Sequence, residues 1–268
     1  MTFPFRMVAL ATALSLSALS AAANPYAEYI SARLLPGWRA ADGTHMAGLE
    51  LDLADGWKTY WRQPGSAGIP PSFDWTRSGN TQMVEVIWPN PEIFELSGMR
   101  SIGYKHRVVL PLKITPGDPS EDVHLSGQIH LGICETVCVP LSLEVSADLS
   151  RQKSGRDPAI VAALASRPFT AKEARLTRAT CRFEPQQNGV GIEARLTLPS
   201  AGQDETAVFE LPQPEMFITD AVTRREGDTL IARATLLNGG PMLLDRSQLR
   251  ITVLGGDHAV EITGCSAG

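Results

Sequence analysis

Short runs of alternating apolar and polar residues, broken by Gly, Pro, Asn and Asp, extend from Tyr26 to about Leu149 and resume from about Ala174 to Cys265. Alternation with a period of two puts successive side chains on opposite faces of a strand. Without a long helical pattern between the runs, it favours antiparallel β-sandwiches in both halves of the chain. The clearest runs are 45–53, 84–88, 107–114 and 123–131, then 190–198, 206–211, 229–236 and 248–254.

The two halves are separated by a stretch with the signals of one short helix. Asp157 can cap a helix, Pro158 suits its first turn, and the alanine-rich run 159–165 favours helix formation. A length of 268 residues is typical of two domains. We therefore expect a first β-sandwich domain over 24–150, a linker with a short helix over 151–173, and a second β-sandwich over 174–268.

The N-terminus has the pattern of a secretory signal peptide. Arg6 precedes an apolar run that ends near Leu19, and Ala21 to Ala23 supply the small residues of a cleavage site. We expect residues 1–23 to be removed and the mature protein to be exported. No later segment reaches the roughly 20 apolar residues of a transmembrane helix. The net charge of −5 gives no basic footprint for nucleic acid.

Four cysteines allow three pairings, and the positions of two of them are unusual. Cys134 and Cys138 lie in an alternating run, where an extended strand would hold them roughly 13 Å apart. Because a disulfide needs Cα atoms within roughly 7 Å, bonding requires residues 135–137 to fold back as a tight turn or one helical turn. A ring this small adds little stability, and accessible, strained bridges are readily reduced. The pair is therefore interpreted as a redox switch.

The other two cysteines mark the ends of the second half. Cys181 opens it and Cys265 closes it. A bond between them would close a long loop, which the chain-entropy model values at about 4 to 5 kcal/mol. We expect Cys181–Cys265 to be a structural disulfide.

Several clusters of rare residues in the first half occur in a characteristic order, which ends with the cysteine pair. In this order they resemble the N-terminal periplasmic domain of the thiol:disulfide interchange protein DsbD, and most of all its ScsB (suppressor of copper sensitivity) branch. The resemblance covers roughly residues 34–150. The clusters are Gly56 to Pro71, Val86 to Pro91, Ile102-Gly103-Tyr104, Val109-Leu110-Pro111 and Cys134 to Pro140.

The resemblance implies an immunoglobulin-like sandwich in which Cys134 and Cys138 are the catalytic redox pair. It also implies a cap loop over the pair, which counting back from Tyr104 places at about Phe94-Glu95-Leu96-Ser97-Gly98, and we count Tyr104 with Phe94, Glu95 and Leu96 among the cap residues. The aromatic cap residue of better-known members corresponds here to Leu96, or is displaced to Phe94. The implied activity is thiol–disulfide interchange without a cofactor, in a family connected with copper tolerance and cytochrome c biogenesis.

In this family a membrane domain reduces the cysteine pair, which then reduces exported partner proteins. Members usually continue into that membrane conduit and a thioredoxin-like domain, and this sequence ends at Gly268 with neither. We therefore expect two kinds of partner. One is a separate membrane electron carrier, and the other comprises exported thioredoxin-like or disulfide-bearing proteins.

Two other classes of function use residues from the same region. Cys134, Cys138, His124 and His130 are ligand types that suit Cu(I) or Zn, although their spacing matches no standard zinc pattern. Trp57, Tyr60 and Trp61 are dense enough to stack on a sugar, although large aromatics commonly fill a sandwich core. The first alternative is a metal-binding or partner-binding module in which the cysteine pair is purely structural.

Charges near the pair in the sequence favour an ordinary thiol. Glu135 would raise the pKa of the adjacent Cys134, and no Lys or Arg lies nearby along the chain to lower it. An acidic thiol would need a cation brought across the sheet, for which the candidates are Lys105, His106 and Arg107.

Overall fold

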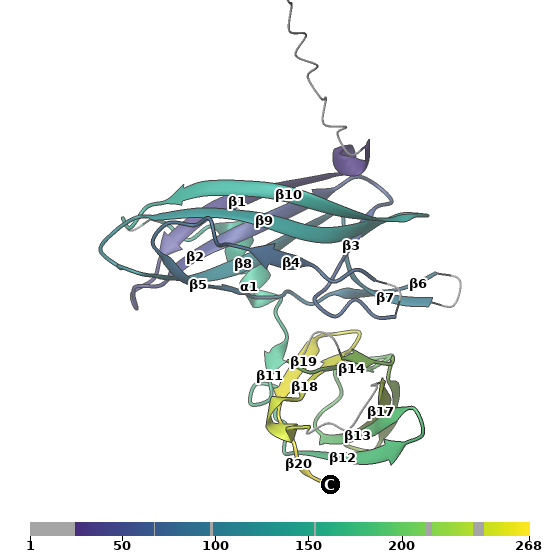
Figure 1. Cartoon of the computed structure of the whole chain (residues 1–268). Helices are drawn as coiled ribbons and strands as arrows, with labels where there is room; N and C mark the ends of the chain where they lie inside the picture. Colours follow the sequence, from purple (N-terminus) through teal and green to yellow (C-terminus); the bar gives the residue numbers. More distant parts are fainter. Residues whose placement is uncertain (1–24, 67, 97–98, 153, 213–215, 238–243) are drawn as a thin grey trace, which may run out of the picture.

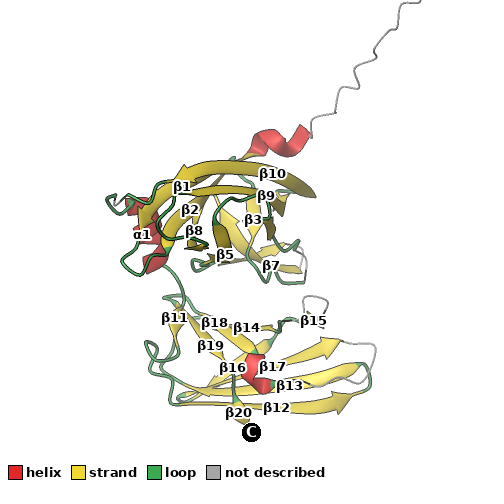
Figure 2. Ribbon diagram, turned by 60° about the vertical axis from the view of Figure 1, so that its left-hand side comes forward, coloured by secondary structure: helices red, strands yellow, loops and turns green. Residues whose placement is uncertain are grey.

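The computed structural model describes residues 25–268 except 67, 97–98, 153, 213–215 and 238–243. The expected signal peptide lies outside the described residues. Those residues form two domains built from β-strands, with one short α-helix between them (Figures 1 and 2). The expected all-β fold class is confirmed. No helix among these residues has the length and apolar character that crossing a bilayer requires.

The first domain is a sandwich of two antiparallel sheets, preceded by a short 3-10 helix, η1 (Pro25–Tyr29). The first sheet has the order β1 (Ile30–Arg39), β2 (His45–Leu53), β8 (Arg107–Pro116), β5 (Thr81–Val86). The second sheet has the order β10 (Cys138–Leu149), β9 (Val123–Cys134), β3 (Lys58–Tyr60), β7 (Met99–Lys105), β6 (Glu92–Leu96), and β4 (Ser72–Asp74) also pairs with β9.

Alternation along β9 decides what each face of the second sheet carries. Leu125, Ile129 and Ile133 point into the core and are fully buried, whereas His124 and His130 point outward and are exposed. Leu49 of β2 and Leu112 of β8 meet them from the other sheet as members of the same core cluster. Burial of such side chains contributes about 1.5 to 3 kcal/mol each, which fixes the register of β9 and so the face on which Cys134 falls.

Helix α1 (Pro158–Ala165) lies where the sequence predicts it. The Asp157 side chain accepts hydrogen bonds from the backbone N–H groups of Ala159 and Ile160, as an N-cap residue does. Ile160 is fully buried and packs with Leu35 and Val109 against the first domain. The predicted linker also contributes a strand, because β11 (Phe169–Thr170) pairs in parallel with a strand of the second domain. The domain boundaries themselves stay predictions.

The second domain is another pair of sheets around its own core. One sheet has the order β11, β19 (Ala259–Thr263), β18 (Arg250–Leu254), β14 (Thr206–Glu210). The other has the order β15 (Phe217–Ile218), β17 (Thr229–Leu237), β13 (Gly189–Thr197), β12 (Arg178–Gln186), β20 (Ser266–Ala267), and β16 (Val222–Glu226) also pairs with β17. A short 3-10 helix, η2 (Arg246–Gln248), precedes β18 of the first of these sheets. Cys181 and Cys265 are bonded to each other, with Cα atoms 5.7 Å apart.

The two domains contact each other through an arginine and a small apolar surface. Arg62, which follows β3, donates two hydrogen bonds to Glu210 at 2.8 and 3.0 Å and one to Glu261 at 2.6 Å. Val208, Leu254 and Ala259 of the second domain belong to the core cluster of the first. In Figure 1 the tip of the second domain that carries β14 and β19 lies beneath the first domain.

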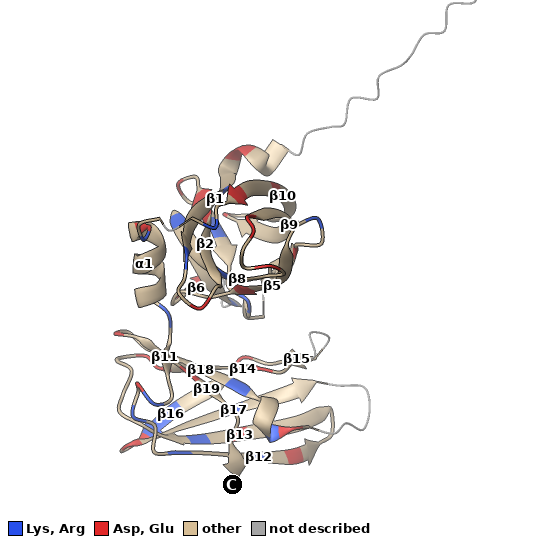
Figure 3. Ribbon diagram, turned by 90° about the vertical axis from the view of Figure 1, so that its left-hand side faces the viewer, with Lys and Arg blue, Asp and Glu red and all other residues tan. Residues whose placement is uncertain are grey.

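Charged residues of both signs are scattered over the strands and loops of both domains, as the side shown in Figure 3 illustrates. Several of them form cross-strand pairs, such as Arg233 with Glu193.

Candidate redox site

The cysteine pair closes the hairpin between β9 and β10. β9 ends at Cys134, β10 begins at Cys138, and the two residues are direct partners across the antiparallel ladder. Their Cα atoms are 4.1 Å apart, and the sulfurs are bonded. Residues 135–137 form the turn, in which the Glu135 N–H lies 3.4 Å from the Val137 carbonyl oxygen. The fold-back that a bond requires is therefore the three-residue connection of a β-hairpin rather than a helical turn.

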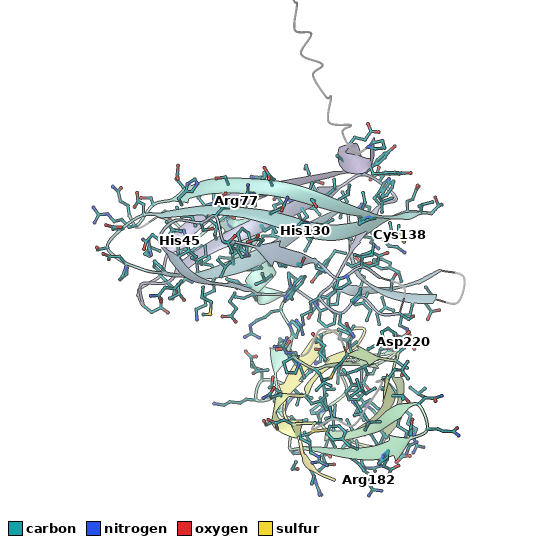
Figure 4. All side chains as sticks on the ribbon, in the orientation of Figure 1. His45, Arg77, His130, Cys138, Arg182 and Asp220 are labelled. Atoms are coloured by element: carbon teal, nitrogen blue, oxygen red, sulfur yellow. A yellow bond between two sulfur atoms is a disulfide. The ribbon has the colours of Figure 1, made fainter. Side chains whose placement is uncertain are left out.

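The two sulfur-bearing residues differ in their access to solvent. Cys134 is only 3% exposed, whereas Cys138 is exposed and lies at the free end of the hairpin (Figure 4). Val137, beside it in the turn, is 58% exposed. A thiolate arriving from outside therefore reaches Cys138, and Cys134 is the sulfur that would depart. The sequence alone could not separate these two roles.

Tyr60 reaches the exposed sulfur from β3. Its hydroxyl donates a hydrogen bond to Cys138 Sγ over 3.1 Å, and the ring is almost completely buried. Burial raises the pKa of Tyr60, so the hydroxyl stays protonated and remains a donor at neutral pH. Gly132 makes room for this ring, because a Cβ there would lie 2.9 Å from Tyr60 Cε2. A glycine within a strand pattern, as at Gly132 beside the cysteines, is a sequence signal that could have pointed to this close approach.

None of the three expected cations lies opposite the pair. Lys105 is one strand further away and forms an ion pair with Glu92 at 2.7 Å. Arg107 pairs with the buried Glu50, and His106 faces Asp55 at 3.8 Å. The cation that is brought across the sheet is Lys58, the direct partner of Cys134 in the ladder between β3 and β9. Sequence reasoning missed it because the register between those strands was unknown.

The predicted cap residues belong to a β-hairpin, not to an irregular loop. Phe94, Glu95 and Leu96 end β6, which pairs with β7. The Phe94 ring has the Lys58 ammonium 5.0 Å from its centre, which brings it to the side of the sheet that carries the sulfurs. Glu95 is exposed and faces Arg100 at 3.8 Å. Ser97 and Gly98, also predicted as cap, lie outside the described residues.

Tyr104 has a different place from the other predicted cap residues. It pairs with Thr59 in the ladder, and its side chain belongs to the buried core cluster of the first domain. Its hydroxyl donates to the Pro89 carbonyl oxygen over 2.8 Å, and burial raises its pKa well above the usual value. Tyr104 therefore packs in the core beneath the hairpin formed by β6 and β7 and does not cover the sulfurs.

The histidines and aromatic residues considered for metal or sugar binding form other contacts. His124 bonds to Asp148 at 2.6 Å and His130 to Ser142 at 2.8 Å, each pair on the outer surface of β9 and β10. Within the described part of the chain, no three His, Cys, Asp or Glu side chains gather in a way that could hold a metal ion. Trp57, Tyr60 and Trp61 are all buried, so their rings are not available for stacking on a sugar.

Comparisons with known proteins fit this geometry. Residues 31–149 match the family described as thiol:disulfide interchange protein DsbD, N-terminal. The crystal structure of the N-terminal periplasmic domain of ScsB from Proteus mirabilis has a similar fold, with a TM-score of 0.63 and 22% identity. The similarity covers 89% of this chain and 92% of that one. No curated protein sequence matches the chain. The stretch 31–149, which contains the Cys134–Cys138 hairpin, thus matches the family of DsbD N-terminal domains.

Proposed function

We propose that this protein is a periplasmic thiol–disulfide exchange module that relays electrons through Cys134 and Cys138. The observation that carries the proposal is the unequal exposure of two bonded cysteines at the tip of one hairpin. A bridge that closes so small a ring stabilises the fold by only about 2 kcal/mol in the chain-entropy model. Its position at the end of the hairpin leaves one sulfur open to attack without any change in the sandwich behind it.

The exchange begins at Cys138. A partner thiolate attacks Cys138 Sγ, the Cys134–Cys138 bond breaks, and its electron pair leaves on Cys134 as a thiolate. A second thiolate of the partner then attacks the partner's own sulfur in the mixed disulfide and releases Cys138. Two electrons have passed from the partner dithiol to the pair. The reverse sequence, started by the Cys138 thiolate on the disulfide of a second protein, passes them on.

Tyr60 assists the second half of this cycle. Its hydroxyl already points at Cys138 Sγ in the bonded state, so it can donate to the Cys138 thiolate once the bridge is open. A hydrogen bond to a charged acceptor stabilises that acceptor by about 1.5 to 3 kcal/mol. The Cys138 thiol is therefore expected to ionise more readily than an exposed thiol next to Glu135 otherwise would.

The partners in this proposal are a separate membrane electron carrier and exported proteins that are thioredoxin-like or bear disulfides. Support comes from the family of the first domain and from a likeness to a domain described as periplasmic. The signal-peptide pattern of residues 1–23 agrees with the same compartment. An oxidising compartment is also where Cys181–Cys265 would persist beside a bridge that cycles.

Single-cysteine variants test the proposal. Cys134→Ala leaves Cys138 able to attack a partner but removes the thiol that resolves the mixed disulfide. Mixed with the disulfide form of an exported thioredoxin-like protein, this variant should accumulate a covalent complex on a non-reducing gel. The matched Cys138→Ala variant, whose remaining thiol is buried, should not. Equal trapping by both variants, or none by either, would contradict the proposed role of the pair.

A further inference from the structure

The ladder between β3 and β9 brings one charged residue to the departing sulfur. Lys58 is the direct antiparallel partner of Cys134, and such partners carry their side chains on the same face with Cα atoms about 4.5 to 5.5 Å apart. A lysine side chain is long enough to span that separation. Cys134 is also the buried member of the pair, so the charge it gains on opening is poorly hydrated there.

While the bridge is closed, the Lys58 ammonium has a neutral partner. It lies 5.0 Å from the centre of the Phe94 ring, a cation–π distance, and the Lys58 side chain is half-buried. Bonded sulfurs carry no charge that would draw the ammonium away. Phe94 therefore keeps the cation on the sulfur-bearing side of the sheet, at the cap hairpin formed by β6 and β7.

The other charged groups around the pair leave this role to Lys58. Lys105, the next residue in the same cross-strand row, already forms an ion pair with Glu92. Glu135 in the turn is a negative charge, and it would oppose ionisation of either sulfur. Tyr60 contributes a neutral hydroxyl, and its contact is with Cys138. Among the described residues that face Cys134 across the sheet, Lys58 is the cation without a carboxylate partner within ion-pair distance.

We propose that Lys58 is the counter-charge of the Cys134 thiolate, and that the Phe94 ring stores this ammonium until the bridge opens. The inference rests on the proposed exchange function and adds a positioning residue to it. When the Cys134–Cys138 bond breaks, its electron pair comes to rest on Cys134 and the ammonium turns from the ring to that charge. Opening of the bridge thereby removes the cation–π contact at Phe94 and loosens the hairpin formed by β6 and β7.

Two measurements on Lys58→Met test the proposal. In the reduced protein labelled with ¹³C at the cysteine Cβ atoms, the pKa of Cys134 should rise by about one pH unit, because an opposite charge is lost. Opening of the oxidised bridge by dithiothreitol should slow on the order of threefold, because a less acidic thiol leaves more slowly. Lys58→Arg should restore both values.

Lys105→Met is the matched control, since it removes the same charge one strand further away. It should leave both values unchanged. Phe94→Leu, which removes the ring and keeps the lysine, should leave the pKa of Cys134 low and make the hairpin amides exchange faster in the oxidised protein. Equal pKa values and opening rates in wild type and Lys58→Met would overturn the assignment of Lys58. A wild-type bridge that dithiothreitol does not open would instead contradict the exchange function itself.

Discussion

The two disulfides of this chain have opposite surroundings. Cys134–Cys138 joins residues four apart at the tip of a hairpin, with one exposed sulfur-bearing residue. Cys181–Cys265 joins residues 84 apart, with Cys181 only 1% exposed inside the core of the second domain. The first closes a ring of negligible length and is open to attack. The second joins β12 to Cys265, the residue just before the C-terminal strand β20, and has one buried and one half-buried cysteine.

Under the proposed function, this difference would let one oxidising compartment host both a reactive bridge and an inert one. Reactivity in thiol exchange depends on access to a sulfur atom, and stabilisation depends on the loop that the bond closes. The first bridge is favourable for exchange and of little value for stability, and the second is the reverse. Each can therefore be perturbed without touching the function of the other.

The largest expected effect is the difference in how much each bridge contributes to the free energy of unfolding. The double variant Cys181→Ala/Cys265→Ala should lower the free energy of unfolding of the second domain by about 4 to 5 kcal/mol in the chain-entropy model. Removing the short bridge by Cys134→Ala/Cys138→Ala should cost about 2 kcal/mol. Urea unfolding followed by circular dichroism measures both. A larger loss for the short bridge would reverse the comparison.

The next largest effect is the difference between the rates at which a thiol reduces the two bridges. In a dithiothreitol series, Cys134–Cys138 should open at least about a hundredfold faster than Cys181–Cys265, because Cys138 is exposed whereas Cys181 is buried and Cys265 is half-buried. Quenching with an alkylating agent and mass spectrometry of the peptides follows each bridge separately. Reduction of both bridges at one rate would mean that global unfolding, not exposure of Cys138, limits access.

The smallest effect sharpens the account of the reactive bridge. Tyr60→Phe should slow the attack of the reduced protein on an aromatic disulfide at neutral pH by about threefold, because the Cys138 thiolate loses its hydrogen-bond donor. Tyr104→Phe makes the same change on the core side of the sheet and should leave the rate unaltered. The absorbance of the released aromatic thiol gives both rates. If Tyr60→Phe attacked the aromatic disulfide as fast as wild type, the Tyr60 hydroxyl would have no role in the exchange.

Much of the fold followed from periodicity. The run 45–53 coincides with β2, and the runs 107–114 and 229–236 lie inside β8 and β17. Asp157 and Pro158 marked the start of the one helix correctly. These signals are local, since alternation and capping depend on residues only a few positions apart. The need for a fold-back between the cysteines was equally local, because it followed from the reach of an extended strand.

The remainder of the site depended on pairings that no local pattern encodes. Lys58 is 76 residues from Cys134, and only the register of β3 against β9 makes them neighbours. The contact from Tyr60 to Cys138 is of the same kind. The predicted cap came from counting back from Tyr104, which located β6 but not the strand pairing that makes it a hairpin. The exposure of Cys138 and the burial of Cys134 likewise depend on the tertiary fold and not on the two residues alone.

Because Arg62 of the first domain donates hydrogen bonds to Glu210 and Glu261 of the second, the first domain depends on the second for part of its stability. Arg62 comes two residues after Tyr60, at the end of a strand only three residues long. A protein cut after residue 150 would retain both cysteines and lose the acidic anchor of that strand. Joining such a fragment to another protein would transfer both sulfurs, but Tyr60 would then lie on a strand held only by its ladders to β7 and β9.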